Sequence, residues 1–243
     1  MPHLVLRTVD GAADLLIEEL RAMPSLHSIR QLTAETVECA VDGSLEELAA
    51  CGLYASAAFE PLSWVRRFGR LERLPWSTNL VVAEVLTRLA KIRTGQLVLD
   101  PFCGTGTILL AVRRRTPGAR VVGVDNDRRA LAMAARNTRR QISLVRAEAG
   151  ALPVADGSVD RVVANLPFGK LVGTHRGNRE LYPAALREID RVLTADGRAV
   201  LLTEDKRLLL QAVDRQRGLK AVRRRLLKYN GATPTAYVLT RPR

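Results

Sequence analysis

The sequence predicts an α/β protein in which a Rossmann-like domain with a seven-stranded sheet follows a small α+β, ferredoxin-like domain. Two observations support this prediction. Between residues 96 and 203, short apolar runs alternate with helical segments, and three of these runs end in Asp or Asn. The first 65 residues instead read as strand, helix, strand, strand, helix and strand. We therefore expect two domains, residues 1–65 and residues 66–243.

The N-terminal segment is predicted to contain four strands and two helices. The segment 12–21 is an amphipathic helix, and a second helix over 44–53 begins with Ser44 and Glu47 at the spacing of a capping box. The strands are expected over 4–9, 28–32, 36–41 and 57–65. This order is that of a ferredoxin-like split motif.

The larger domain opens with an apolar run, Gln96–Asp100, that leads into the loop Asp100-Pro-Phe-Cys-Gly-Thr-Gly-Thr107. A helix is expected to follow from about Thr105. A strand, a glycine turn and a helix together present backbone N–H groups to a ligand at the helix N-terminus. Glycine suits this turn because a Cβ would obstruct the ligand and strain a positive φ.

The spacing in this loop favours S-adenosylmethionine (AdoMet) over a dinucleotide or a nucleoside triphosphate. The loop has Gly-x-Gly without a third glycine, and the chain has no Gly-Lys-Ser/Thr phosphate loop. Asp100 would repel a pyrophosphate but suits the ammonium of methionine. The alternative is a tight turn without a ligand. The residues of this loop expected to bind AdoMet are Asp100, Pro101, Phe102, Gly104, Gly106 and Thr107.

Two more acids follow the next two predicted strands. The strand Arg120–Asp125 places Asp125 where α/β nucleotide folds hold ribose hydroxyls, although the same residue could instead cap the helix starting near Asp127. Glu148 follows the strand 142–146 and is expected to accept a hydrogen bond from the adenine amine, or else is a surface acid. Their neighbours Asn126 and Ala149 complete the predicted AdoMet site.

A second loop, Asn165-Leu-Pro-Phe168, ends the strand predicted over 159–164. An exocyclic amine on a base is a poor nucleophile because its lone pair is delocalised into the ring. The Asn165 side-chain oxygen and the backbone carbonyl of Leu166 or Pro167 could accept its N–H groups and aim the lone pair at a methyl sulfonium. Phe168 offers a stacking face worth roughly 1–3 kcal/mol. The four loop residues are therefore the predicted catalytic group, with Asn165 also beside AdoMet; the alternative is an ordinary βα turn.

These motifs resemble those of the THUMP-associated tRNA guanine-N2-methyltransferases. The resemblance covers about residues 70–243 and includes the two loops, the segment Leu181–Leu193 and the segment Tyr229–Leu239. It implies a class I methyltransferase fold, AdoMet as cofactor with S-adenosylhomocysteine as product, no metal, and methylation of the guanine 2-amino group in RNA, with tRNA as first choice.

The resemblance also implies roles for individual residues. Asp100, Gly104 and Gly106 match the family's AdoMet loop, Asp125 matches its ribose acid, and Glu148 stands where Asp is usual. The motif Asn165–Phe168 matches the target-amine motif, which begins with Asn or Asp. Many DNA adenine and protein glutamine methyltransferases carry a second proline where this chain has Leu166.

The chain departs from this family between its two predicted domains. Residue 65 leads almost directly to the segment Leu74–Asn79, which leaves no room there for the THUMP domain that grips tRNA. We therefore expect the catalytic face or a protein partner to supply the grip, or the substrate to be a different RNA.

The net charge of +13 is distributed unevenly. Residues 1–65 hold three Arg, no Lys and ten acids, or −7, whereas residues 66–243 carry +20. A basic catalytic domain suits a polyanion such as RNA. A genome that favours Arg on all surfaces is an alternative, but the acidic N-terminal segment argues against it as the whole cause.

Other features of the sequence exclude several classes. No apolar run is long enough to span a membrane, and no signal peptide is present. Cys39, Cys51 and Cys103 share no metal-binding spacing, so we expect a cytoplasmic protein with reduced cysteines and no metal. Cys103 is read as a small packing residue because no base partner for it is evident.

The remaining segments complete the predicted sheet. A helix is expected over 78–89, a strand over 198–203, and a closing antiparallel pair over 219–228 and 235–240. The Gly-rich segment 171–179 is read as a mobile loop beside the target motif or as a solvated connection. Three other functions stay open: a small-molecule or nucleoside N-methyltransferase, a non-catalytic RNA-binding protein, and an rRNA or DNA amino-methyltransferase.

Overall fold

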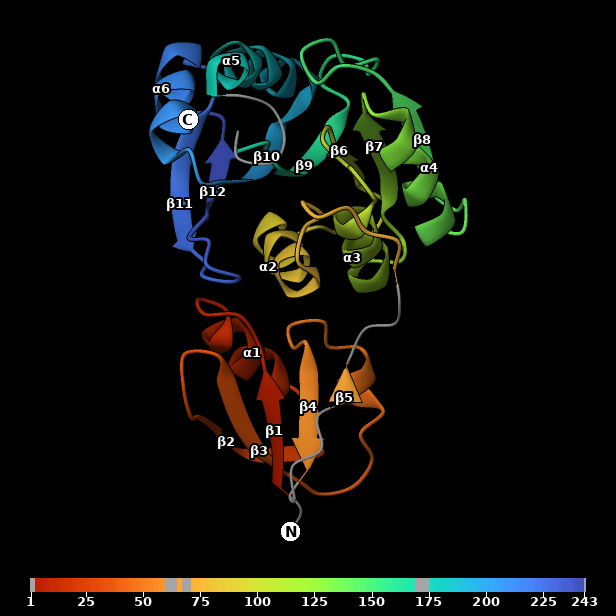
Figure 1. Cartoon of the computed structure of the whole chain (residues 1–243), viewed down its shortest axis with the longest axis vertical. Helices are drawn as coiled ribbons and strands as arrows, with labels where there is room; N and C mark the ends of the chain where they lie inside the picture. The colour runs from red at the N-terminus through yellow and green to blue at the C-terminus, as the bar shows by residue number, and fades with distance from the viewer. Residues whose placement is uncertain (1–2, 60–64, 67–70, 169–174, 243) are drawn as a thin grey trace.

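A computed structural model describes residues 3–59, 65–66, 71–168 and 175–242 of the chain, which contain two separate sheets (Figure 1). The larger sheet has seven strands in the order β11-β12-β10-β9-β6-β7-β8. Its strands are β6 (Leu97–Asp100), β7 (Arg120–Asp125), β8 (Ser143–Arg146), β9 (Val159–Asn165), β10 (Leu193–Thr203), β11 (Lys220–Leu226) and β12 (Thr235–Thr240). The strands β6 to β10 pair in parallel, and β12 and β11 close the sheet antiparallel, as the sequence predicts.

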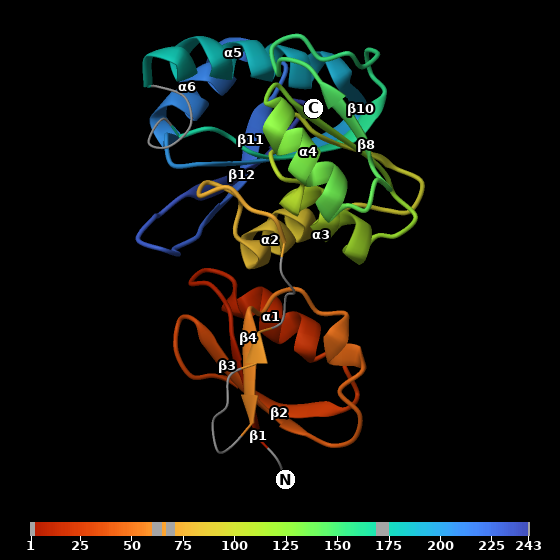
Figure 2. The same ribbon diagram turned by 45° about the vertical axis from the view of Figure 1, so that its right-hand side comes forward.

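Helices cover both faces of this sheet. They are α2 (Leu80–Ala90), α3 (Thr107–Arg115), α4 (Arg128–Asn137), α5 (His175–Val192) and α6 (Lys206–Gln216). The helices α2 and α3 lie on the face toward the N-terminal domain, and α5 and α6 lie on the opposite face (Figures 1 and 2). Because both faces are covered, the buried stretches of the central parallel strands, such as Val162–Ala164 of β9, are apolar. The predicted α/β fold is confirmed.

Side chains cap three of these helices at their N-termini. The Asn79 side chain accepts from the N–H groups of Val81 and Val82 at the start of α2. Asp127 caps α4, and Asp205 caps α6. Each cap satisfies backbone donors that the helix itself leaves without partners.

The N-terminal residues form a five-stranded sheet in the order β2-β3-β1-β4-β5. Its elements are β1 (His3–Arg7), α1 (Ala13–Leu20), β2 (Leu26–Gln31), β3 (Thr36–Val41), the 3₁₀ turn η1 (Glu47–Ala49), β4 (Ser56–Phe59) and β5 (Val65–Arg66). The strand β3 lies between β1 and β2, which is the split arrangement that the sequence predicts. The strand predicted over 57–65 divides into β4 and β5, with residues 60–64 outside the described ranges.

The helix predicted over 44–53 is wrong, because only one 3₁₀ turn forms there. The expected capping box does not form. Ser44 Oγ accepts from the N–H of Glu46, and the Glu47 carboxylate accepts from Ser25 Oγ at 3.3 Å instead of folding back on the cap. Without the reciprocal bonds, the segment has no start signal strong enough to extend the turn.

The N-terminal segment and the helices of the larger sheet share one buried apolar cluster, in which α1 packs toward α2 and α3 (Figure 2). Ion pairs reinforce this contact. Glu19 of α1 accepts from Arg88 at 3.0 Å and from Arg115 at 3.1 Å. Buried Glu84 of α2 pairs with Arg114 of α3 beside them. The N-terminal domain is therefore fixed on the helices beneath the larger sheet.

A second contact joins the N-terminal domain to the far edge of the sheet. Arg225 of β11 pairs with Asp14 through two bonds of 2.6 and 2.8 Å. The Lys228 N–H donates to the Asp10 carbonyl at 3.0 Å. A Cβ on Gly11 would lie 2.3 Å from the Leu226 carbonyl oxygen, so only glycine permits this approach. The N-terminal domain thus supports the connection between β11 and β12.

Within the described ranges, every helix is too short or too polar to cross a membrane.

Candidate active site

A cavity of about 800 Å³ lies at the edge of the sheet where the parallel strands end. The loops that follow β6, β7, β8 and β9 all contribute to it, as expected for a ligand site in an open α/β sheet. Two further segments that the predicted site does not include, Arg73–Asn79 and Tyr229–Ala232, form other parts of the wall. The predicted site residues that line the cavity are Pro101, Phe102, Gly104, Thr107, Asp125, Asn126, Glu148, Ala149, Asn165, Leu166, Pro167 and Phe168.

The glycines of the first loop have two different roles. Gly104 has a φ of +51°, and a Cβ placed on it meets no atom within 4 Å, so a side chain there would enter open space at the cavity. Gly106 does not line the cavity. It has a φ of +82° at the N-terminus of α3, and a Cβ there would lie 3.3 Å from the Ala134 Cβ. Gly104 therefore leaves room for a ligand, and Gly106 allows close packing of α4.

Asp125 holds the loop and the start of α4 together. Its Oδ2 accepts from the Gly104 N–H at 2.8 Å, and its Oδ1 accepts from the Asp127 N–H at 2.9 Å. The N-cap of α4 is Asp127, whose side chain accepts from the Arg129 N–H, so Asp125 does not serve as that cap. Since a carboxylate can accept about four hydrogen bonds, Asp125 retains capacity for two hydroxyls of a ligand.

The part of the cavity wall formed by Asn126 and Glu148 is exposed to solvent. The Asn126 Nδ2 donates to both carboxylate oxygens of Glu148 at 3.2 Å. Both side chains are exposed at the cavity rim, where β7 and β8 end. In this position the Glu148 carboxylate can accept a hydrogen bond from the amine of a base. The predicted contact with the adenine amine of AdoMet stays a prediction.

Asp100 is fully buried and does not line the cavity. Its Oδ1 accepts from the Phe102 N–H at 3.0 Å, whereas its Oδ2 has no partner among the described residues. Burial, and secondarily the charge of Asp125, raises the pKa of this carboxyl well above 3.8, against the effect of the Phe102 N–H. A buried acid without a full set of partners fits a ligand that brings a positive charge, such as the ammonium of AdoMet.

The raised pKa of Asp100 predicts a pH dependence of AdoMet binding. Because a bound ammonium favours the ionised carboxylate, AdoMet affinity should rise as the pH rises above 3.8 and through the raised pKa. Asp100→Asn cannot ionise, so its affinity should be lower and its pH profile flatter. Isothermal titration calorimetry of both proteins over a pH series measures this. A wild-type profile as flat as that of the variant would contradict the assignment.

The second loop places an unsatisfied acceptor in the cavity wall. Asn165 ends β9, and its Nδ2 donates to Thr78 Oγ1 at 3.0 Å. Its Oδ1 is buried and has no partner within the described part of the chain. Such an atom costs free energy unless a ligand supplies a donor. The side chain is thus oriented by Thr78 and ready to accept one N–H group.

The backbone carbonyls of this loop differ in their availability. The Pro167 carbonyl accepts from Asn178 Nδ2 at 2.8 Å and from the Tyr182 hydroxyl at 2.9 Å, so its two lone pairs are used. The Leu166 N–H donates to the Leu202 carbonyl at 3.0 Å and ties the loop to β10. The sequence allows either the Leu166 or the Pro167 carbonyl as acceptor for the amine. Because the Pro167 carbonyl already has two donors, the Leu166 carbonyl is the candidate acceptor.

A directed chain of hydrogen bonds positions the Pro167 carbonyl. The Asp205 N–H donates to Thr203 Oγ1 at 2.9 Å, and this hydroxyl lies 2.9 Å from the Tyr182 hydroxyl. Because a carbonyl can only accept, Tyr182 must donate to Pro167 and accept from Thr203. Burial raises the pKa of Tyr182 to about 12, which keeps its proton in place.

Asn178 and Tyr182 belong to the site although the sequence pattern did not predict them. The segment 171–179 was predicted as a loop, but residues 175–179 begin α5, and residues 169–174 lie outside the described ranges. Asn178 and Tyr182 are four residues apart, a spacing that places both side chains on one face of a helix. This spacing could have predicted that they act together. Both donate to the Pro167 carbonyl from that face.

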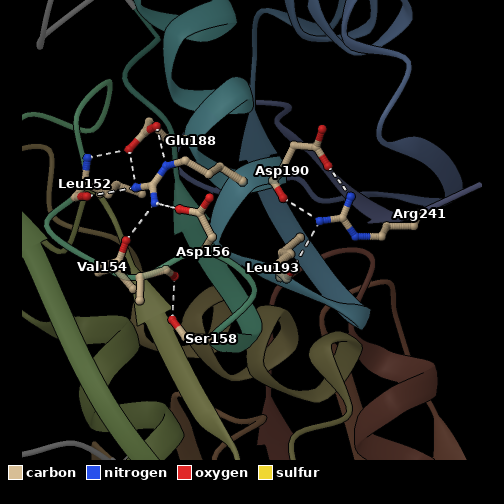
Figure 3. Close-up of polar contacts among 10 residues, drawn as sticks. Leu152, Val154, Asp156, Ser158, Glu188, Asp190, Leu193 and Arg241 are labelled. Carbon is tan, nitrogen blue, oxygen red and sulfur yellow. Dashed lines mark hydrogen bonds and ion pairs between the residues drawn. The ribbon is translucent and has the colours of Figure 1, made fainter.

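The other end of α5 is anchored by two arginines (Figure 3). Arg191 donates to Glu188, to Asp156 at 2.5 Å and to the carbonyls of Leu152 and Val154. Arg241 donates to the Asp190 carboxylate at 2.5 Å. These contacts fix the helix that carries Asn178 and Tyr182, and so help to hold the loop beside the cavity.

Cysteine and metal chemistry find no support in the part of the chain that the structure describes. No group of three His, Cys, Asp or Glu side chains there could hold a metal ion. Burial raises the pKa of the Cys103 thiol, so this residue acts as a small packing group beside the loop.

Comparison with known proteins identifies the family. A family model described as UPF0020, RMKL-like, methyltransferase domain, matches residues 75–234. The chain belongs to this RMKL-like methyltransferase family. The match includes both loops and most residues that line the cavity, so the predicted methyltransferase fold and the predicted methyltransferase family are confirmed.

Curated relatives resemble this chain over part of their own length. The chain is 33% identical to the tRNA (guanine(6)-N(2))-methyltransferase THUMP3 of Homo sapiens, over 69% of this chain and 36% of that protein. It is 36% identical to the tRNA (guanine(6)-N2)-methyltransferase of Thermus thermophilus, over 74% of this chain and 53% of that protein. The chain thus spans about a third to a half of these curated relatives. The crystal structure of TrmN from Thermus thermophilus has the same fold, with a TM-score of 0.82 and 23% identity over the whole of both chains.

Proposed function

We propose that this RMKL-like methyltransferase transfers a methyl group from AdoMet to the 2-amino group of guanosine in RNA, with tRNA as the first candidate. The observation that carries the proposal is the buried Asn165 Oδ1, which has no partner among the described residues and lies in the wall of a cavity that the glycine loop also lines. The named activities of the human and Thermus thermophilus relatives support the choice of amine.

The residues of the cavity fit AdoMet. The Gly104 turn leaves open space, Asp125 has acceptor capacity for the ribose hydroxyls, and Asp100, buried where the glycine loop begins, has an Oδ2 without a partner among the described residues, which favours a nearby cation such as the ammonium. Glu148 would accept from the adenine amine. When bound, AdoMet supplies a methyl group on a positively charged sulfur.

The chain's own contribution to the reaction is orientation. Asn165 Oδ1 and the Leu166 carbonyl accept the two N–H groups of the amine, which directs its lone pair toward the methyl group. Phe168 stacks on the base, and Thr78 keeps the amide of Asn165 in the required orientation. Catalysis by position and electrostatics needs no covalent intermediate with the protein.

The organisation of the chain supports RNA as the substrate class. We propose that residues 1–65 form an accessory domain and residues 66–243 form the catalytic domain, which carries the +20 charge. Phosphates of a polyanion would lie along the basic domain. A protein partner could add RNA grip, and the reaction would take place in the cytoplasm.

Comparison of two acceptors tests the proposal. Turnover with tRNA should exceed turnover with free guanosine, and only the reaction with tRNA should weaken steeply as salt rises, because RNA binding releases counterions. Initial rates of labelled methyl transfer over a salt series measure both. Equal, salt-independent turnover of free guanosine would instead favour a small-molecule methyltransferase.

A further inference from the structure

An aromatic side chain of the cavity wall has no role in the mechanism above. Trp76 lines the cavity and is 43% exposed, so it lies where the cavity opens to solvent. Other large hydrophobic side chains are exposed on the part of the surface that the structure describes, but none of them lines the cavity; they are Leu32, Val145, Val222 and Leu226. Trp76 thus combines an exposed aromatic ring with a place in the site.

A braced turn, Leu74–Ser77, carries this ring. The Ser77 N–H donates to the Leu74 carbonyl at 2.9 Å and closes a β-turn. Pro75 stands at the second position of the turn, where its fixed φ favours this conformation. The Leu74 N–H donates back to Ser77 Oγ at 2.8 Å, and Arg73 Nη2 donates to two carbonyls after the turn, at 3.2 and 3.0 Å. The backbone beneath the ring is therefore fixed before a ligand binds, which lowers the entropy cost of binding.

Hydrogen bonds attach this turn to both loops of the site. Ser77 Oγ lies 2.9 Å from Thr105 Oγ1 in the glycine loop. The next residue, Thr78, accepts from Asn165 Nδ2 at 3.0 Å. Asn137 Nδ2 donates at 2.9 Å both to the Thr105 carbonyl and to a carbonyl of the segment before the turn. A ligand that binds Trp76 is therefore positioned relative to the AdoMet loop and to the amine-binding side chain.

The charge beside the ring indicates what the turn binds. Arg73 lines the cavity and is exposed, and its bonds to backbone carbonyls do not neutralise its positive charge. Aromatic rings in a positively charged groove are the means by which proteins bind single-stranded nucleic acid. A nucleotide supplies both partners, because its base has a π-face for Trp76 and its phosphate has a negative charge for Arg73.

We propose that Trp76 binds the substrate RNA by stacking on a nucleobase at the entrance of the cavity, with a phosphate near Arg73. This inference rests on the proposed function and names a residue that holds its substrate. The stacked base is the target guanine or the nucleotide next to it, since every base has a π-face. Trp76 therefore contributes affinity for RNA, whereas Asn165 selects the amine.

Trp76→Ala tests the proposal by removing the ring. We expect its affinity for tRNA to fall by about 5- to 150-fold, the range for one lost base–aromatic stack, while AdoMet affinity stays unchanged. Trp76→Phe keeps a ring and should recover most of the affinity. Leu32→Ala is the matched control, because Leu32 is 45% exposed on the N-terminal part of the chain and does not line the cavity. Titrations of each variant with tRNA and with AdoMet measure both affinities.

Tryptophan fluorescence distinguishes stacking from a structural role. The chain has two tryptophans, so the difference between the wild type and Trp76→Phe isolates the emission of Trp76. We expect tRNA to quench this emission. The same titration with guanosine monophosphate in the presence of S-adenosylhomocysteine identifies the base. Quenching by guanosine monophosphate assigns the stack to the target guanine, and quenching by tRNA alone assigns it to the neighbouring nucleotide.

Three results would overturn the inference while the proposed function stands: wild-type tRNA affinity in Trp76→Ala, an emission of Trp76 that tRNA does not change, or a loss of AdoMet affinity equal to the loss of tRNA affinity. Failure of the proposed function gives a different result. A wild-type enzyme whose Trp76 emission is quenched by tRNA, but which methylates no guanosine in it, would overturn the proposed function and leave the stacking contact intact.

Discussion

Replacing Asn165 by Ala is expected to lower the turnover number for methyl transfer by at least about 10²-fold while AdoMet affinity changes little. The variant removes the buried Oδ1 that the structure leaves for a ligand donor. Loss of one preorganised hydrogen-bonding group costs about 10²- to 10³-fold in comparable sites. Single-turnover rates and calorimetric AdoMet binding measure the two effects separately.

Asn165→Asp is the matched control for this prediction. It keeps an acceptor oxygen at the same position, and it can accept from the Thr78 hydroxyl instead of donating to it. We expect it to retain far more activity than the Ala variant. If Asn165→Ala keeps wild-type turnover, the amine is held by other groups and the role assigned to Asn165 is wrong.

The second large effect is expected on stability, at the contact between the two domains. Glu84→Ala should lower the free energy of unfolding by about 3–5 kcal/mol, because it leaves Arg114 without its carboxylate in a mostly buried position. Burial raises the pKa of Glu84 despite Arg114, which shows that desolvation is costly there. The loss therefore reflects the removal of the buried carboxylate from beside the Arg114 guanidinium more than a strong pair. Urea or thermal unfolding measures it.

Glu18→Ala provides the comparison within the same interface. Glu18 also pairs with an arginine, Arg88, at 3.0 Å, but its side chain is 70% exposed. An exposed pair of this kind contributes about 0–1 kcal/mol. Equal losses from the two substitutions would mean that burial of Glu84 does not govern the stability of the contact.

The sequence predicts those parts of the site in which a loop directly follows its strand along the chain. The loops Asp100–Thr107 and Asn165–Phe168 each follow an apolar strand, and parallel strands end at one edge of the sheet, so their meeting could be expected. The closing pair β11 and β12 was also predictable from its alternation and position.

Other parts depend on contacts between distant segments. Asn178 and Tyr182 donate to Pro167 from α5, whose first residues belong to the Gly-rich segment that the sequence predicts as a loop, so these contacts were not expected. Ser44 and Glu47 have the spacing of a capping box, but the bond from Ser25 diverts the glutamate.

The central claim is methyl transfer to the guanine 2-amino group in RNA. The most direct test is to incubate the protein with labelled AdoMet and total RNA from a strain that lacks this gene, then to separate the RNA by size and analyse its nucleosides by mass. The account predicts label in N2-methylguanosine, first in the tRNA fraction. Absence of label from guanosine in every RNA fraction, with AdoMet binding intact, would contradict it.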